Sequence, residues 1–101
     1  MKYINITGDG DHVLGNKTGV NHHFERILIS NNHAAQDNKC ALFLNDGSTS
    51  YYFFKGLVVP ASTTFIFNED YTYDNRKYIL YLSTLDGDSG NSTSLTVVLK
   101  S

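Results

Sequence analysis

The chain has 101 residues, of which 41% are hydrophobic, 13% aromatic and 18% charged, and its net charge is −2. This length and composition predict a single folded domain over residues 1–101 and exclude a disordered or fibrous chain. The eight Lys and Arg residues are scattered along the chain, which excludes the basic footprint of a nucleic-acid binder or of a polybasic membrane protein. We therefore expect neither nucleic acid nor a membrane as a partner.

The residue pattern argues against helices of any kind. Asn, Ser and Thr, which favour turns and strands, far outnumber Ala, Glu and Gln. No window of a dozen residues shows apolar side chains at helical spacing, and no apolar run approaches the roughly 18 residues of a transmembrane helix. The turn residues Gly8 and Asp9 follow the first apolar residues too closely for a signal peptide.

Short alternating apolar segments, bounded by Gly, Asn and Asp, predict strands instead. Seven are expected, at residues 2–7, 22–30, 40–44, 51–54, 63–67, 78–82 and 95–99. An eighth strand is expected at either 12–14 or 57–59, and Asp46-Gly47 between two apolar runs predicts a hairpin. The spacing of these strands predicts an all-β fold, a single antiparallel β-sandwich of the jelly-roll or Ig-like type with seven to eight strands.

The aromatic segment 51–54 has more apolar side chains than a sandwich strand needs. Simple alternation places Tyr52 and Phe54 on one face and Tyr51 and Phe53 on the other. Because a sandwich buries only one face of each strand, we expect one pair in the core and the other at a contact with another protein chain. The rings of Tyr71 and Tyr73 are expected to join this interface.

Two acidic glycine loops have the residues of a calcium loop but not its full ligand set. An EF-hand requires Gly at its sixth position and a bidentate carboxylate at its twelfth. Counted from Asp86, these positions hold Asn91 and Val97, and the loop that begins at Asp9 fails in the same two places. The four histidines have no zinc-type spacing with a cysteine. We expect no metal ion and no cofactor.

Signatures of catalysis are missing from the sequence as well. It has no Gly-x-Ser-x-Gly elbow, no glycine-rich phosphate loop before a helix, and only two Glu residues. Cys40 lies in the apolar run 39–44, which is typical of a buried small side chain rather than a reactive thiol. We expect no catalytic residues and no enzyme activity.

Three segments form a distinctive set: a strand ending in Ser-Asn (27–32), a strand with a short turn (41–47), and an aromatic strand that leads into a Val-Pro-Ala-x-x-Thr corner (51–64). Together they resemble small virion proteins of tailed bacteriophages. Pro60 suits such a corner because it has no N–H to give to a sheet. The resemblance extends over about residues 24–99. It implies an accessory structural β-sandwich on a phage particle, without chemistry of its own.

On this resemblance we expect a capsid decoration, or cement, subunit that stabilises the assembled head. One alternative is a neck, tail or baseplate component. From a different class, the alternative is a carbohydrate- or receptor-binding module that uses Tyr51, Tyr52, Tyr71 or Tyr73 as an aromatic platform. The expected partners are other virion proteins, either the major capsid protein or neck and tail subunits. The chain would form homo-oligomers on the virion, which assembles in the host cytoplasm.

Overall fold

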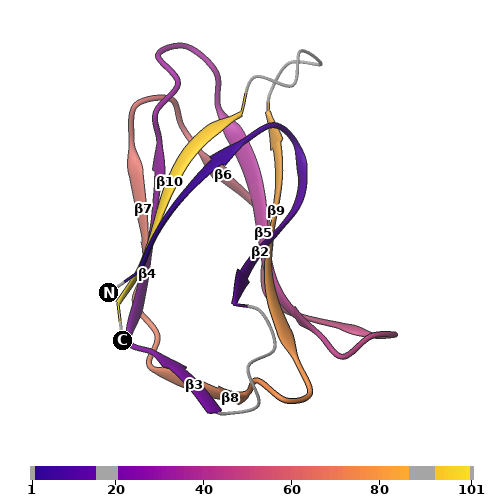
Figure 1. Cartoon of the computed structure of the whole chain (residues 1–101). Coiled ribbons are helices and arrows are strands. Elements are labelled where there is room, and N and C mark those ends of the chain that lie inside the picture. Colours follow the sequence, from indigo (N-terminus) through magenta and orange to yellow (C-terminus); the bar gives the residue numbers. More distant parts are fainter. Residues whose placement is uncertain (1, 16–20, 87–92, 101) are drawn as a thin grey trace.

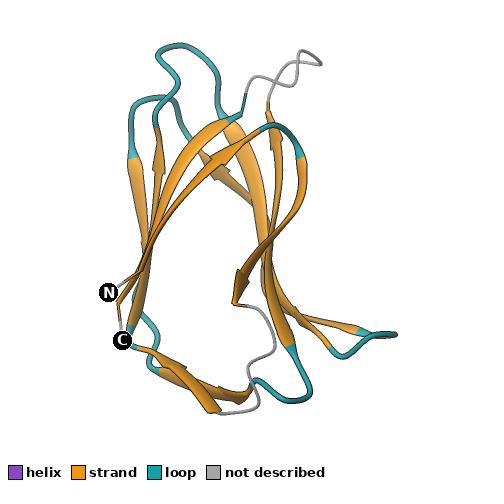
Figure 2. Ribbon diagram, viewed as in Figure 1, coloured by secondary structure: helices purple, strands orange, loops and turns teal. Residues whose placement is uncertain are grey.

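The computed structural model describes residues 2–15, 21–86 and 93–100, which form ten β-strands and no helix (Figure 1, Figure 2). In chain order the strands are β1 (Lys2–Thr7), β2 (Gly10–Gly15), β3 (Asn21–Phe24), β4 (Arg26–Asn31), β5 (Asn38–Asn45), β6 (Ser50–Val59), β7 (Thr64–Phe67), β8 (Tyr71–Asp74), β9 (Ile79–Asp86) and β10 (Ser94–Lys100). The all-β prediction is therefore confirmed.

The strands form two four-stranded antiparallel sheets and one two-stranded ribbon. Sheet 1 has the order β1-β10-β4-β7, sheet 2 has the order β2-β9-β5-β6, and β3 pairs with β8. Figure 1 shows the two sheets facing each other, with the β3-β8 ribbon across one end. The pairing is nested, because β1 pairs with β10, β2 with β9, β3 with β8, β4 with β7 and β5 with β6. A long hairpin folded over in this way is a jelly roll.

The core lies between the two sheets, where every second side chain points inward. Along β4 and β10 buried and half-buried residues alternate strictly, as a strand with one covered face requires. Each fully buried aliphatic or aromatic side chain contributes about 1.5–3 kcal/mol to folding. The largest fully buried apolar side chains are Phe24, Leu14, Ile27, Ile29, Leu42, Leu80, Leu82, Leu95, Val59 and Val97.

The strand count of seven to eight was too low, for three reasons. The predicted strand 22–30 divides at Glu25 into β3, which pairs with β8, and β4, which belongs to sheet 1. At the division the Glu25 N–H donates to the Lys100 carbonyl at 2.7 Å. Both positions considered for an eighth strand are extended, 12–14 within β2 and 57–59 as the continuation of β6. The short strand β8 was not predicted. The loop that follows Asp86 lies outside the described residues.

The predicted turn after β5 is present and is held by its own side chains. The Asp46 carboxylate accepts the backbone N–H groups of Ser48 (3.0 Å) and Thr49 (2.8 Å). Gly47 has a φ of +106°, a conformation that costs glycine little. The hairpin prediction is therefore confirmed.

The end of β4 meets the corner at Pro60 that follows β6. Asn31, the buried residue that ends β4, donates its side-chain amide to the carbonyls of Val59 (3.0 Å) and Gln36 (2.8 Å). Its side-chain oxygen accepts the His33 N–H at 3.0 Å. A buried amide satisfied in this way ties the end of β4 to the corner, since losing its partners would leave buried polar groups unpaired.

Strand β6 does not alternate as the sequence predicted. Phe54 lies opposite Leu42 and Tyr52 lies opposite Phe43, so Phe53 is an extra residue in a β-bulge. A second irregularity precedes Leu57, where Gly56 has a φ of +70°. The expected pair of Tyr52 with Phe54 was therefore wrong, because these two residues lie on opposite faces. Tyr51 lies opposite the core residue Leu44 and so stays on the inner side with Phe53, as predicted. Because of the bulge, Phe53 and Phe54 both pack against the core.

Candidate functional site

The six aromatic residues predicted as one interface separate into three groups. One ring lies on the outer face of sheet 2, two rings pack against the core, and three tyrosines line a pocket at one end of the sandwich. Each group has a different neighbourhood, so each offers different chemistry.

A continuous apolar row crosses all four strands of sheet 2. Val13 of β2 lies beside Tyr81 of β9, and Phe43 of β5 lies between Tyr81 and Tyr52 of β6. The Phe43 ring centre is 5.0 Å from that of Tyr52 and 5.3 Å from that of Tyr81, and the second pair is stacked at 16°. Such ring pairs contribute about 0.5–1.5 kcal/mol beyond the area they bury. We call these four residues the ring row.

The ring row faces away from the core. Phe43 lies between Leu42 and Leu44 along β5, and both leucines belong to the core, so alternation directs the ring to the outer face. Phe43 is nevertheless almost completely covered, because the two tyrosines shield it. Tyr52 stays 47% exposed. The row is a pre-packed aromatic surface on the outside of the molecule.

The rest of this outer face adds apolar groups and positive charge. Leu85 and Val58, both about half exposed, lie on either side of Lys39. Lys39 and Lys55 line a shallow hollow of about 220 Å³. The Lys55 ammonium lies 4.9 Å from the centre of the Tyr52 ring, a cation–π geometry. We call the ring row together with Lys39, Lys55, Val58 and Leu85 the outer face of sheet 2.

Phe53 and Phe54 serve the interior rather than the surface. Phe53 meets the fully buried Phe24 edge-on, with ring centres 6.0 Å apart. Phe54 contacts Phe65 and Phe67 of β7, at 5.7 and 5.5 Å. Since β6 and β7 are edge strands of opposite sheets, these rings close one side of the sandwich.

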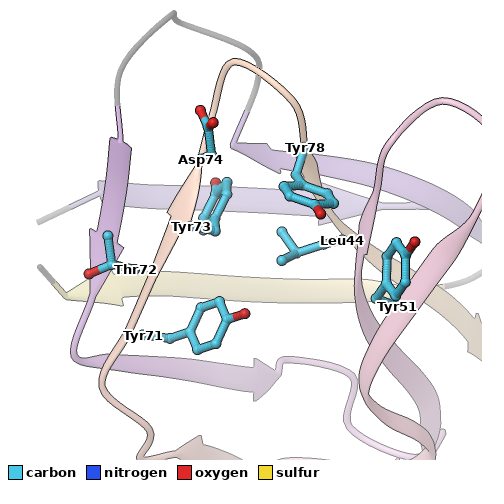
Figure 3. Close-up of a pocket in the computed structure, with 7 residues that line it drawn as sticks. All are labelled: Leu44, Tyr51, Tyr71, Thr72, Tyr73, Asp74 and Tyr78. Atoms are coloured by element: carbon cyan, nitrogen blue, oxygen red, sulfur yellow. The ribbon is translucent and has the colours of Figure 1, made fainter.

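A pocket of about 320 Å³ lies between β8, the turn that follows it and the β5–β6 hairpin. Figure 3 shows the rings of Tyr51, Tyr71 and Tyr78 arranged around Leu44. The lining residues are Leu44, Tyr51, Tyr71, Thr72, Tyr73, Asp74 and Tyr78. We call this site the tyrosine pocket.

Packing holds the pocket rings in place. Tyr71 lies edge-on against Phe53 with ring centres 4.8 Å apart, and Tyr51 meets Tyr78 edge-on at 6.0 Å and 85°. Tyr73 is only 4% exposed; it belongs mainly to the core and presents little surface to a partner. Burial raises the pKa of the Tyr73 phenol to about 12, so it stays protonated at neutral pH.

Asp74 lines the tyrosine pocket, and Asp46 lies at its border, bonded to the Tyr51 hydroxyl; both carboxyls are ionised at neutral pH. Asp74 accepts the Arg76 side-chain and backbone N–H groups, each at 3.0 Å, and these bonds hold the Asp74 pKa below its usual value. The backbone N–H groups of Thr49 and Ser48 lower the pKa of Asp46, whose other oxygen accepts the Tyr51 hydroxyl at 3.4 Å. Hydrogen bonds to the charged form are the physical cause in both cases.

The residues considered for metal binding and reactivity have ordinary structural roles. Within residues 2–15, 21–86 and 93–100, no three His, Cys, Asp or Glu side chains are grouped so that they could hold a metal ion. Asp9 accepts the Thr93 hydroxyl, and His23 pairs with Asp70. Cys40 is 1% exposed, which confirms the buried position predicted for it, and burial raises its thiol pKa to about 12.

Sequence reasoning missed the central members of both surfaces. The ring row depends on Tyr81 and Phe43, and the tyrosine pocket on Tyr78 and Leu44. Alternation alone predicts that Tyr81 faces outward, because Tyr81 stands between Leu80 and Leu82, which point to the other face. Which rings become neighbours depends on the cross-strand register, and no single segment of the sequence determines that register.

No protein-family model and no curated protein matches this sequence. The residues that the structure describes include no helix long and apolar enough to cross a bilayer.

Proposed function

We propose that the chain is a non-enzymatic structural subunit of a tailed-phage particle, and specifically a decoration subunit that stabilises the assembled head. Three observations support this. The segments that meet at the Pro60 corner resemble those of small phage virion proteins. Jelly rolls recur in viral capsid domains, which is an analogy at the level of fold alone. The third observation is the outer face of sheet 2, and it carries the proposal.

The outer face of sheet 2 has the properties of a docking surface. Four of the exposed large apolar side chains lie on it: Val13, Tyr52, Val58 and Leu85. Exposed apolar patches of this kind mark contact sites, and pre-packed tyrosines lose little entropy on binding. Lys39 and Lys55 favour a partner surface that carries carboxylates.

The proposed mechanism is mechanical. Each copy covers its outer face of sheet 2 with the surface of another virion subunit, and each ring fully buried there contributes about 1.5–3 kcal/mol. A protein that binds the assembled lattice, and not the separated subunits, stabilises the lattice by mass action. Neighbouring copies repeated over the particle would add these contributions.

Virions of the phage that encodes the chain, deprived of this protein and mixed with purified variants, test the proposal. The double variant Val13→Ser/Tyr52→Ser should stay folded but fail to rejoin the particle. The matched control is Tyr3→Ser/Ile66→Ser, which likewise removes one ring and one aliphatic side chain, both somewhat more exposed, from sheet 1 and should rejoin normally. Bound protein is measured by sedimentation with the particles.

A density map of the complete particle then locates the subunit. Density over the head lattice supports decoration, whereas density only at the neck, tail or baseplate would transfer the role to those structures. Absence of the protein from the virion, or normal rejoining by Val13→Ser/Tyr52→Ser, would overturn the proposed docking.

A further inference from the structure

The tyrosine pocket is a second site, independent of the outer face of sheet 2. The neighbouring residues Tyr51 and Tyr52 divide between the two, since Tyr51 lies opposite Leu44 and lines the pocket whereas Tyr52 lies opposite Phe43 in the ring row. Both are about half exposed. A ligand in the tyrosine pocket would therefore leave the ring row uncovered.

The groups that line the tyrosine pocket are amphipathic. A tyrosine ring offers an apolar face for packing and a hydroxyl that both donates and accepts hydrogen bonds. Four such rings, those of Tyr51, Tyr71, Tyr73 and Tyr78, surround the single aliphatic side chain Leu44. A sugar ring matches this lining, because it has C–H groups on its faces and hydroxyls around its edge.

The charges around the tyrosine pocket favour a neutral ligand. Asp74 is paired with Arg76. Asp46 accepts the Tyr51 hydroxyl, and the Lys77 ammonium lies 5.3 Å from the centre of the Tyr78 ring. Two carboxylates and two cations therefore offset each other. Carboxylate oxygens at the border also accept hydrogen bonds from the hydroxyls of a ligand, and such charge-assisted bonds are among the stronger ones.

The size and rigidity of the tyrosine pocket suit one sugar ring. Its volume of about 320 Å³ lies near the lower end of the range for small-molecule sites. Tyr71 is held against Phe53, and Tyr51 against Tyr78. Rings already fixed by packing lose little conformational freedom when a ligand binds.

We propose that the tyrosine pocket binds a neutral saccharide, with one sugar ring seated over Leu44 between Tyr51, Tyr71 and Tyr78. This site gives the chain a binding activity in addition to its proposed docking role. On a particle, the tyrosine pocket would attach the particle to a neutral glycan of a cell surface.

Saturation-transfer NMR on the full chain tests the proposal. The probes are the methyl glycosides of glucose, galactose, mannose, fucose and the two N-acetylhexosamines, with N-acetylneuraminic acid as the anionic comparison. At least one neutral glycoside should bind with a Kd on the order of 1–10 mM, as the size of such a ligand allows. The anionic sugar should bind more weakly.

Adjacent residues provide the matched control. Tyr51→Ala should raise the Kd about tenfold or more, because it removes a ring from the pocket. Tyr52→Ala, next to it on β6 and equally exposed, should leave the Kd unchanged. Tyr78→Ala is the second pocket variant, and thermal melting verifies that each variant is folded.

Three outcomes would overturn the saccharide site: no neutral glycoside binds, Tyr51→Ala and Tyr52→Ala weaken binding equally, or both folded pocket variants bind as the parent does. None of these outcomes affects the docking proposal, which depends on Tyr52 and Val13. Conversely, a chain that fails to join the particle yet binds a glycoside through Tyr51 would retain the saccharide site.

Discussion

The two sheets of the sandwich carry different outer faces because they differ in regularity. In sheet 1 the strands pair without a register shift. In sheet 2 the register shifts once between β2 and β9 and twice between β5 and β6. A bulge adds a residue to one strand and redirects its side chains. The difference therefore determines which side chains reach the surface.

On the outer face of sheet 1, polar side chains of neighbouring strands hydrogen-bond to one another. The Thr96 hydroxyl donates to Asn5 at 3.1 Å, and Ser30 and Thr64 are bonded at 2.8 Å. One apolar row also crosses this sheet, but it contains a single ring and lies between this polar ladder and the basic residues Arg26 and Lys100. The row consists of Tyr3, Val98, Leu28 and Ile66.

The outer face of sheet 2 instead concentrates three rings that lie beside one another across the strands. The bulge at Phe53 allows Phe54 and Tyr52 to keep opposite faces while Phe53 joins the core. Sheet 1 is thus regular, whereas the bulges of sheet 2 place aromatic side chains at a surface and at a pocket. Three measurements test which side chains the two sheets bury.

The largest effect is expected at an inner position of the regular sheet. Ile29→Ala should lower the free energy of unfolding by about 2–5 kcal/mol, because it opens a cavity in a fully buried site. Leu28→Ala, its neighbour on the outer face, should cost about 1 kcal/mol or less. Denaturant unfolding measures both. Equal losses would contradict the strict alternation of β4.

The next largest loss of stability is expected at Phe53, in the bulge of β6. Phe53→Ala should lower the free energy of unfolding by about 1–3 kcal/mol, less than for a fully buried Phe, since Phe53 is half-buried against Phe24. Tyr52→Ala should cost less than Phe53→Ala. If Phe53 instead faced outward, its replacement would change stability by less than about 0.5 kcal/mol.

Alkaline pH should weaken the fold through its buried acids. The ordinary pKa of a cysteine thiol is 9.0 and that of a tyrosine phenol is 10.0. Burial raises the pKa of both Cys40 and Tyr73 to about 12 in the folded chain. Between the ordinary and the raised pKa the unfolded chain has lost a proton that the folded chain keeps. Stability is therefore fully present below pH 9 and falls as pH rises toward 12, by up to about 1.4 kcal/mol per pH unit for each group.

Variants identify the groups behind this pH dependence. Cys40→Ala should flatten the fall of stability above pH 9 and Tyr73→Phe the fall above pH 10, measured by denaturant unfolding at a series of pH values. A slope that neither variant changes would show that these groups do not carry the proton linkage.

Much of the fold was determined by local pattern. The alternation of Ile27 and Ile29, the Asp46-Gly47 turn and the scarcity of helix formers each predict strands and turns without reference to the rest of the chain. Cys40 was placed correctly by its apolar neighbours alone. These features follow from periods of two residues and from the conformational freedom of glycine, which are local properties.

The two candidate surfaces were decided by the tertiary structure. The sequence identified the aromatic residues of β6 as surplus to one core, but alternation assigned Tyr52 and Phe54 to the same face, and the bulge changed that assignment. The ring row joins Val13 to Tyr52 through Tyr81 and Phe43, residues from four strands. Their contact depends on the nested pairing of strands far apart in the chain, and a bulge forms where two strands must match. Both are properties of strand pairs, so no pattern within a single segment specifies them.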